Sequence, residues 1–175
     1  MNADQARMLM EYMTKLWEGE YPATCKVLAA VPDGKRDYKP DDKSRSAWDL
    51  TVHLAAGDLW FLDSIRTGAF AWNPDSEKTI LAQHPTVADI VKMYTEGFPE
   101  KLKAVRAMSD ADLSKTVDFF GMFQWPNVSY LGFANNHSVH HRGQLASYLR
   151  AMGSKVPAIY GGSADEPMKA ASQGA

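Results

Sequence analysis

Apolar side chains recur with the 3.6-residue period of an α-helix along four long stretches of the chain. The clearest stretch covers residues 126–153, which begin with a proline and end with a glycine. Proline suits the first helical position and glycine the position just past the last turn, so this pattern predicts one helix over residues 126–153. At about 100° per residue, one broad stripe of this helix holds Leu131, Ala134, Ser138, His141, Leu145, Tyr148, Leu149 and Met152.

Three further stretches predict helices over residues 3–30, 48–65 and 86–108. We expect the first to be bent or broken at residues 19–22, because a proline inside a helix removes a backbone hydrogen bond. Ser46 and Asp49 have the spacing of a capping box before the second helix, and Thr86 and Asp89 have it before the third. A kink is expected at Pro99 in the third of these helices.

The connections between these helices are long and rich in turn-forming residues. Residues 31–44 are expected to form a loop, residues 67–85 an ordered connection that covers one end of the bundle, and residues 109–125 a short turn or extended piece. After the last helix, Val156, Pro157, Ile159 and Tyr160 are expected to pack against the rest of the chain. The sequence thus predicts an all-α, four-helix bundle with long connections and a short irregular C-terminal tail. Residues 1–166 would form a single domain, and residues 167–175 a disordered tail.

Composition excludes several classes of function. The 175 residues are 45% hydrophobic and 23% charged, with a formal net charge of -2, so nothing favours binding to nucleic acid or to an anionic membrane. No run of 18 apolar residues and no secretory signal pattern are present. The single cysteine, Cys25, cannot form an internal disulfide, and its apolar helical setting predicts a buried, inert thiol. We therefore expect a cytoplasmic protein.

Two histidines stand four residues apart in the last predicted helix. Their Cβ atoms would lie about 6 Å apart, so His137 and His141 can converge on one point, whereas His140 points away from the buried stripe. A lone histidine on an apolar face is usually an ordinary core residue, but two of them need partners, and one metal ion satisfies both. The glutamate of a HExxH protease helix is absent, because Ser138 follows His137, so a third ligand must come from elsewhere.

The second predicted helix supplies His53, with Gly57 four residues later. Gly57 either leaves room for an ion or ligand, or lets two helices approach closely. Asp49 could orient the imidazole of His53 or cap its helix, and we favour the cap. If the second and last helices are neighbours, then His53, His137 and His141 form a three-imidazole cluster that suits a transition metal and leaves a position open.

Three segments of the chain have distinctive sequences: AWDLTVHLAAGD (residues 47–58), NNHSVHHRGQLASYLRAMG (residues 135–153) and VPAIYGGSADE (residues 156–166). Together they resemble the DinB/YfiT-like superfamily of metal-binding bundles. The resemblance implies a four-helix bundle of unusual connectivity, often dimeric, with one metal ligand from the second helix and an HxxxH pair from the last. It thereby implies His53, His137 and His141 as ligands of a divalent transition-metal ion. Zinc or nickel is favoured, and iron, manganese and copper are alternatives.

Characterised members of the resembled superfamily include transferases and isomerases that use low-molecular-weight thiols. This implies a metal-dependent enzyme acting on a small-molecule substrate, with a thiol S-transferase as the first hypothesis. A metal-dependent hydrolase, or a stress-associated metal-binding protein without turnover, is the alternative. We expect Trp60 and Tyr148 to border a pocket at the open metal position. A homodimer is expected because the second helix is apolar on more than one side, and because the resembled proteins are often dimers.

Overall fold

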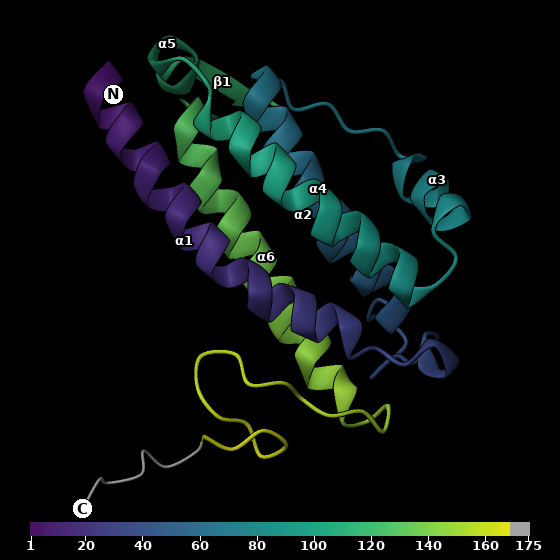
Figure 1. The fold of residues 1–175 in the computed structure, drawn as a ribbon. Coiled ribbons are helices and arrows are strands. Elements are labelled where there is room, and N and C mark those ends of the chain that lie inside the picture. The colour runs from purple at the N-terminus through teal and green to yellow at the C-terminus, as the bar shows by residue number, and fades with distance from the viewer. Residues whose placement is uncertain (169–175) are drawn as a thin grey trace, which may run out of the picture.

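The computed structural model describes residues 1–168. Ten elements follow one another along the chain: α1 (Ala3–Ala29), the 3-10 turn η1 (Asp33–Lys35), α2 (Ala47–Thr67), α3 (Ser76–Gln83), α4 (Val87–Arg106), α5 (Asp110–Ser114), β1 (Thr116–Phe119), β2 (Phe123–Pro126), the 3-10 turn η2 (Asn127–Ser129) and α6 (Tyr130–Leu149) (Figure 1). The prediction of an all-α bundle built on four long helices is confirmed. The disorder predicted for residues 167–175 falls mainly outside the described residues.

The four long helices do not follow each other around the bundle. α2 packs against α4 and α6, and α1 packs against the same two helices, so the consecutive helices α1 and α2 lie diagonally opposite each other. Figure 1 shows α2 running antiparallel to α6 and in the same direction as α4. This order makes α2 and α6 neighbours, although 62 residues separate the end of α2 from the start of α6.

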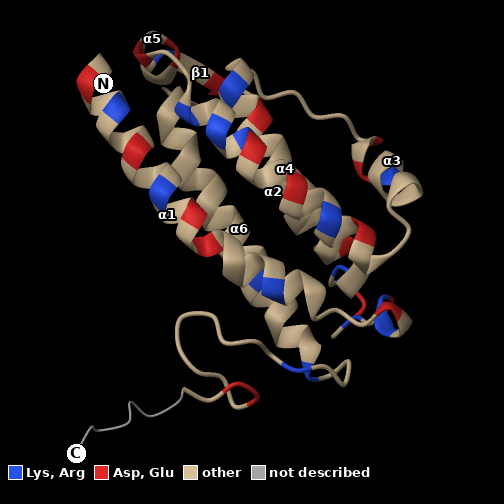
Figure 2. Ribbon diagram, in the orientation of Figure 1, with Lys and Arg blue, Asp and Glu red and all other residues tan. Residues whose placement is uncertain are grey.

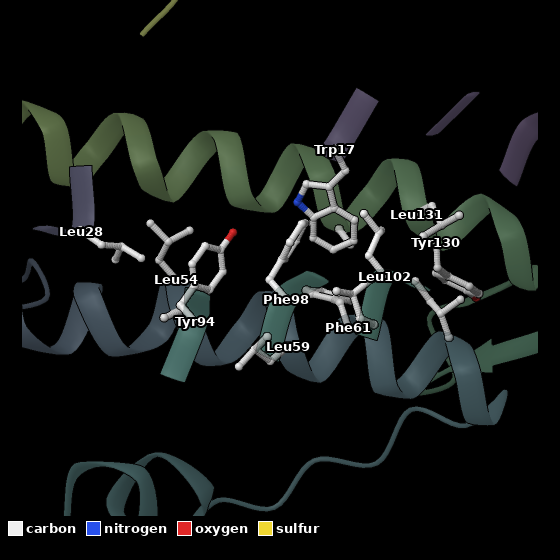
Figure 3. Close-up of a cluster of buried hydrophobic side chains, with 14 of the residues drawn as sticks. Trp17, Leu28, Leu54, Leu59, Phe61, Tyr94, Phe98, Leu102, Tyr130 and Leu131 are labelled. Atoms are coloured by element: carbon white, nitrogen blue, oxygen red, sulfur yellow. The ribbon is translucent and has the colours of Figure 1, made fainter. Parts of the chain in front are cut away.

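Aromatic and aliphatic side chains from all four helices fill the core, and Figure 3 shows Trp17, Tyr94 and Phe98 at its centre. The ring of Trp17 meets that of Phe98 edge to face, with centroids 5.4 Å apart, and Tyr21 stacks on Phe98 at 5.0 Å. Such pairs add about 0.5–1.5 kcal/mol each to the free energy gained from burying the rings. The core therefore fixes the relative positions of the helices that carry the histidines.

Helix α1 is continuous through Pro22, so it is not broken at residues 19–22, and the alternative of a bend there stays a prediction. Pro22 and Glu18 both lie on the solvent side, where water can bind the carbonyl group that loses its hydrogen bond to the missing proline N–H. Helix α4 likewise continues through Pro99, and the hydroxyl of Tyr21 donates to the carbonyl of Thr95, four residues before that proline, at 3.1 Å. A kink at Pro99 stays a prediction.

The last helix begins four residues later than predicted, because Pro126 ends strand β2 instead of opening a helix. Strands β1 and β2 form an antiparallel hairpin in which Thr116 pairs with Pro126 and Phe119 with Phe123. The extended piece expected within residues 109–125 is therefore a two-stranded hairpin preceded by the short helix α5. At the other end, α6 stops at Leu149, four residues before the predicted end, and Gly153 has a positive φ of 80°, which suits a chain turning away after a helix.

The connection of residues 67–85, expected to be an ordered segment covering one end of the bundle, contains α3, which lies outside the bundle beside α2 (Figure 1). After α6 the chain packs back as expected at three positions: Pro157 is buried, and Val156 and Ile159 contact the core. Tyr160 is instead 74% exposed, although its hydroxyl donates a hydrogen bond to Glu20.

Figure 2 shows acidic and basic residues interspersed along α1 and α4. Within residues 1–168, none of the helices combines the length and apolar character that crossing a bilayer requires.

Candidate metal centre

The bundle brings three histidines from two helices together. His53 comes from α2, and His137 and His141 come from one face of α6. Each offers a ring nitrogen, and these three nitrogens lie within 4.8 Å of one another. Because α2 and α6 are antiparallel neighbours, a histidine in the first half of α2 lies beside two near the middle of α6. This group could hold a metal ion.

Two of the rings are oriented by hydrogen bonds at their Nδ1 atoms. His53 Nδ1 is 3.0 Å from Glu77 Oε1, and His141 Nδ1 is 2.8 Å from Gln144 Oε1. An ionised carboxylate and an amide oxygen can only accept, so Nδ1 donates in both rings. In a neutral ring that donates from Nδ1, the lone pair lies on Nε2, the atom left for a metal.

The distance between the Nε2 atoms of His53 and His137 fits a shared cation. These atoms lie 3.2 Å apart. Two nitrogen ligands of a tetrahedral zinc ion, each at about 2.0–2.1 Å, stand about 3.3 Å apart. On the far side of its ring, His137 Nδ1 is buried and has no hydrogen-bond partner among the described residues. The donor set and its spacing therefore fit a first-row transition metal.

The histidines of α6 are held in the neutral form that a metal requires. Burial, with further contributions from His141 and His53, lowers the pKa of His137 to about 3. Burial also lowers the pKa of His141, against a smaller opposing effect of its hydrogen bond with Gln144. Both rings are thus free of a competing proton near neutral pH.

Gly57 lies against the ring of His137. A Cβ atom at this position would be 3.1 Å from His137 Cε1, so the missing side chain makes room for the imidazole. Asp49 does not orient His53, since that role falls to Glu77. Its backbone N–H donates to the hydroxyl of Ser46, which caps α2, although its carboxylate does not complete a capping box.

A cavity of about 480 Å³ adjoins the cluster and is lined by both His53 and His137. Trp60 forms part of its wall. Tyr148 does not line it, and instead meets the ring of Tyr38 edge to face at 5.6 Å. The reason is the direction of the helices: Trp60 follows His53 along α2, which leads toward the N-terminal half of α6, whereas Tyr148 lies beyond His141 toward its C-terminal end.

The remaining histidines and the cysteine lie outside the cluster. His140 is exposed, as its position on the helix predicts, and His84 follows the end of α3. Cys25 is half-buried, and burial raises the pKa of its thiol, so the neutral and less reactive form is favoured.

Two buried polar groups next to the site were not singled out from the sequence. The carboxylate of Asp58 is fully buried and accepts hydrogen bonds from Ser138 at 2.8 Å and Tyr94 at 2.9 Å. Burial raises the pKa of Asp58 to about 7. Arg142 is also buried and forms an ion pair with Glu20 at 2.6 Å.

Sequence reasoning also missed Glu77 and the role of Gln144. The signal for Gln144 was available, because a residue three positions after His141 lies on the same side of the helix. Glu77 had no such signal: it lies 24 residues from His53, in a segment without clear periodicity.

Comparisons with known proteins agree with this architecture. A model of the DinB family matches residues 3–172. Among curated proteins, the uncharacterized protein YrdA of Bacillus subtilis is 27% identical over 157 residues, which is 90% of this chain and 91% of YrdA. The uncharacterized protein YjoA of the same organism is 28% identical over 121 residues, which is 66% of this chain and 73% of YjoA.

Two solved structures share the fold. A DinB-like protein from Bacillus cereus superposes with a TM-score of 0.64 at 26% identity, over 86% of this chain and 97% of the other. The DinB-like protein YjoA from Bacillus subtilis superposes with a TM-score of 0.62 at 20% identity, over 83% of this chain and 96% of the other. Because the family model matches nearly the whole sequence, the chain belongs to the DinB family.

Proposed function

We propose that the protein is a metal-dependent enzyme, a thiol S-transferase, with one divalent ion held by the Nε2 atoms of His53, His137 and His141. The observation that carries the proposal is the orientation of the rings. Glu77 and Gln144 accept from Nδ1 of His53 and His141, which leaves Nε2 of both rings for a metal, and the three rings offer nitrogens within 4.8 Å of one another. Zinc or nickel is the proposed ion, because imidazole ligands suit both.

Three protein ligands leave a position open for a substrate atom. An ion bound there would supply Lewis acidity, lowering the pKa of a thiol or water molecule in the open position. The residues of the chain have two tasks. Glu77 keeps His53 in the required tautomer, and the apolar cavity beside His53 and His137 holds the second substrate away from water. In the proposed transfer, the thiol sulfur bonds to an electrophilic carbon, the leaving group departs with its bonding electrons, and the thiol proton passes to solvent.

The carboxylates at the cavity are engaged in ion pairs, and this favours transfer over hydrolysis. Glu77 is engaged with His53 and Arg45, and Asp63 with Lys101 and Arg66. Among the described lining residues, no further carboxylate is available to take a proton from an attacking water molecule. A reaction that consumes thiols needs a compartment that keeps them reduced, so the cytoplasm is the proposed location.

The metal assignment is tested by metal analysis of protein purified without a histidine tag. We expect one transition-metal ion per chain, sharply reduced in His53→Ala, His137→Ala and His141→Ala. His140→Ala is the matched control, since it removes an exposed imidazole from the same helix. Full occupancy in the His137→Ala and His141→Ala proteins would refute the ligand set.

The reaction is tested by comparing metal-loaded wild-type protein with His141→Ala. Both are assayed with low-molecular-weight thiols and electrophilic acceptors, and then with ester and amide substrates. Conjugation by the wild type alone supports the transferase, and hydrolysis by the wild type alone replaces it with a hydrolase. Equal rates for the two proteins in both panels would instead favour a metal-binding protein without turnover.

A further inference from the structure

We infer that the cavity beside His53 and His137 binds an uncharged, ring-bearing apolar molecule and discriminates against carboxylates. This inference rests on the proposed function in one respect, because it identifies the acceptor substrate. Binding itself can be measured without a metal and without turnover.

The size and walls of the cavity suit a flat organic molecule. Its volume of about 480 Å³ lies within the range of about 300–1,000 Å³ that is usual for small-molecule sites. Side chains from α2, the segment after α2, α4, β1 and α6 form its apolar walls: Trp60, Phe61, Trp72, Met93, Phe119 and Phe133. The rings of Trp60 and Trp72 stand nearly perpendicular, at 84°, with centroids 5.9 Å apart. A ring in this cavity could stack on one indole while meeting the edge of the other.

The charges around the cavity disfavour an anion. The lining residues include the carboxylates of Asp63 and Glu77, but the described lining contains no lysine or arginine. Lys101 and Arg45, the cations paired with these carboxylates, do not line the cavity. A carboxylate bound among these walls, away from the histidines, would therefore lose its hydration without gaining a cationic partner. A neutral molecule does not lose the hydration free energy of a charge when it binds.

Helix α3 both lines the cavity and contacts one of the histidines. Ser76, Glu77 and Ile80, on one side of α3, line the cavity, and Glu77 also contacts His53. A molecule enclosed between α3 and Trp60 thus lies beside two of the proposed metal ligands. This placement suits the acceptor, whose electrophilic carbon must come within reach of the open metal position.

The experiment uses chelator-treated full-length protein and two probes of one shape, neutral 2-naphthol and anionic 2-naphthoate. Binding is measured at neutral pH by calorimetry and by quenching of tryptophan fluorescence. We expect the Kd of 2-naphthol to be at least tenfold lower than that of 2-naphthoate. Equal affinities, or tighter binding of 2-naphthoate, would overturn the inference.

Two variants locate the binding site. Ala56→Phe fills the cavity from α2 and should raise the Kd of 2-naphthol at least tenfold, whereas Ala88→Phe, an exposed alanine of α4 outside the cavity, should not change it. If Ala56→Phe fails to fold, Ile80→Trp narrows the cavity from the peripheral helix α3. An unchanged Kd in the folded cavity variant would place the ligand elsewhere and refute the inference.

The outcomes separate the two proposals. If 2-naphthol binds as expected but no thiol conjugation occurs with any acceptor, the cavity assignment holds and the proposed enzyme activity fails. If conjugation occurs while 2-naphthol does not bind, the enzyme activity holds and the cavity assignment fails.

Discussion

Replacing Gly57 by alanine would place one methyl group against the ring of the proposed ligand His137. The added Cβ atom would lie 3.1 Å from His137 Cε1 and 3.8 Å from His137 Nδ1. Carbon–carbon contacts are most favourable at about 3.5–4.0 Å, so the imidazole must move by about 0.4 Å or more. The ring cannot relax freely, because the neighbouring ring of Phe61 stands with its centroid 5.2 Å from that of His137.

This displacement should weaken metal binding more than it changes folding. Metal–ligand distances tolerate deviations of about 0.2 Å, so we expect at least a tenfold loss of zinc affinity, equivalent to about 1.4 kcal/mol. Alanine in a helix interior is more favourable than glycine by about 0.8–1.0 kcal/mol, which offsets the cost of the tight contact. The free energy of unfolding of the metal-free protein should therefore change little.

Zinc affinity is measured by competition with a chromophoric chelator, and stability by urea unfolding in the presence of a strong chelator. Gly19→Ala is the matched control, because this glycine lies in α1 and an added Cβ would meet nothing within 4 Å. It should gain helix stability and keep the wild-type zinc affinity. If Gly57→Ala also keeps the wild-type affinity, the space left by Gly57 is not what positions the ring of His137 at the ion.

Three further predictions concern the histidine partner, the buried titratable groups and the assembly. Glu77→Ala should lower metal affinity about 10–100-fold. Glu77→Gln should lower it less, because the amide oxygen of the new side chain can still accept from His53. Chelator competition measures both affinities, and the exposed Glu100→Ala is the control. In metal-free protein, unfolded His137 takes up a proton near pH 6.5 but folded His137 only near pH 3, so its contribution to stability is lost as pH falls through that window. For Asp58 the pKa rises from 3.8 unfolded to about 7 folded, so its contribution is lost as pH rises through that window. Asp58→Asn leaves the effect of His137, so urea unfolding between pH 4.5 and 6.5 should show a free energy of unfolding that rises with pH. His137→Gln leaves the effect of Asp58, so the free energy of unfolding should fall with pH over the same range. Slopes of the same sign in both variants would contradict this assignment. Finally, we expect a homodimer, for which light scattering at micromolar concentration should report twice the mass of one chain; the mass of a single chain would rule it out.

The bundle and the meeting of its histidines could be predicted because both depend on long periodic segments. The spacing of His137 and His141 sets their common face on any helix, and the resemblance to a known family placed His53 opposite them. The starting point of the last helix could not be predicted in the same way. Pro126 suits a helix start as well as the end of a strand, and only the pairing of Pro126 with Thr116 decides between them.

The periphery of the site was harder to predict, since it depends on contacts between distant residues. Helix α3 has only eight residues and little apolar periodicity, yet it supplies Glu77. The segment between α2 and α3 covers part of the apolar surface of α2, because the ring of Trp60 packs against the rings of Phe70 and Trp72. That surface therefore does not require a second copy of the protein, and the expectation of a dimer now depends on the resemblance alone.

The positions of the two histidines on α6 are set by the residues that follow them. One residue further along a helix, a side chain points about 100° away, so Ser138 and Arg142 face the core while His137 and His141 face the site. Ser138 donates to Asp58, the neighbour of Gly57, and thereby fixes α6 against α2 next to the contact between Gly57 and His137. Arg142 donates to the carbonyl of Glu20 at 3.1 Å and fixes α6 against α1. The spacing of the Nε2 atoms thus follows from buried hydrogen bonds in the core. Glu77 is the exception, because it reaches His53 from the peripheral helix α3, so this side of the site depends on how α3 packs against α2.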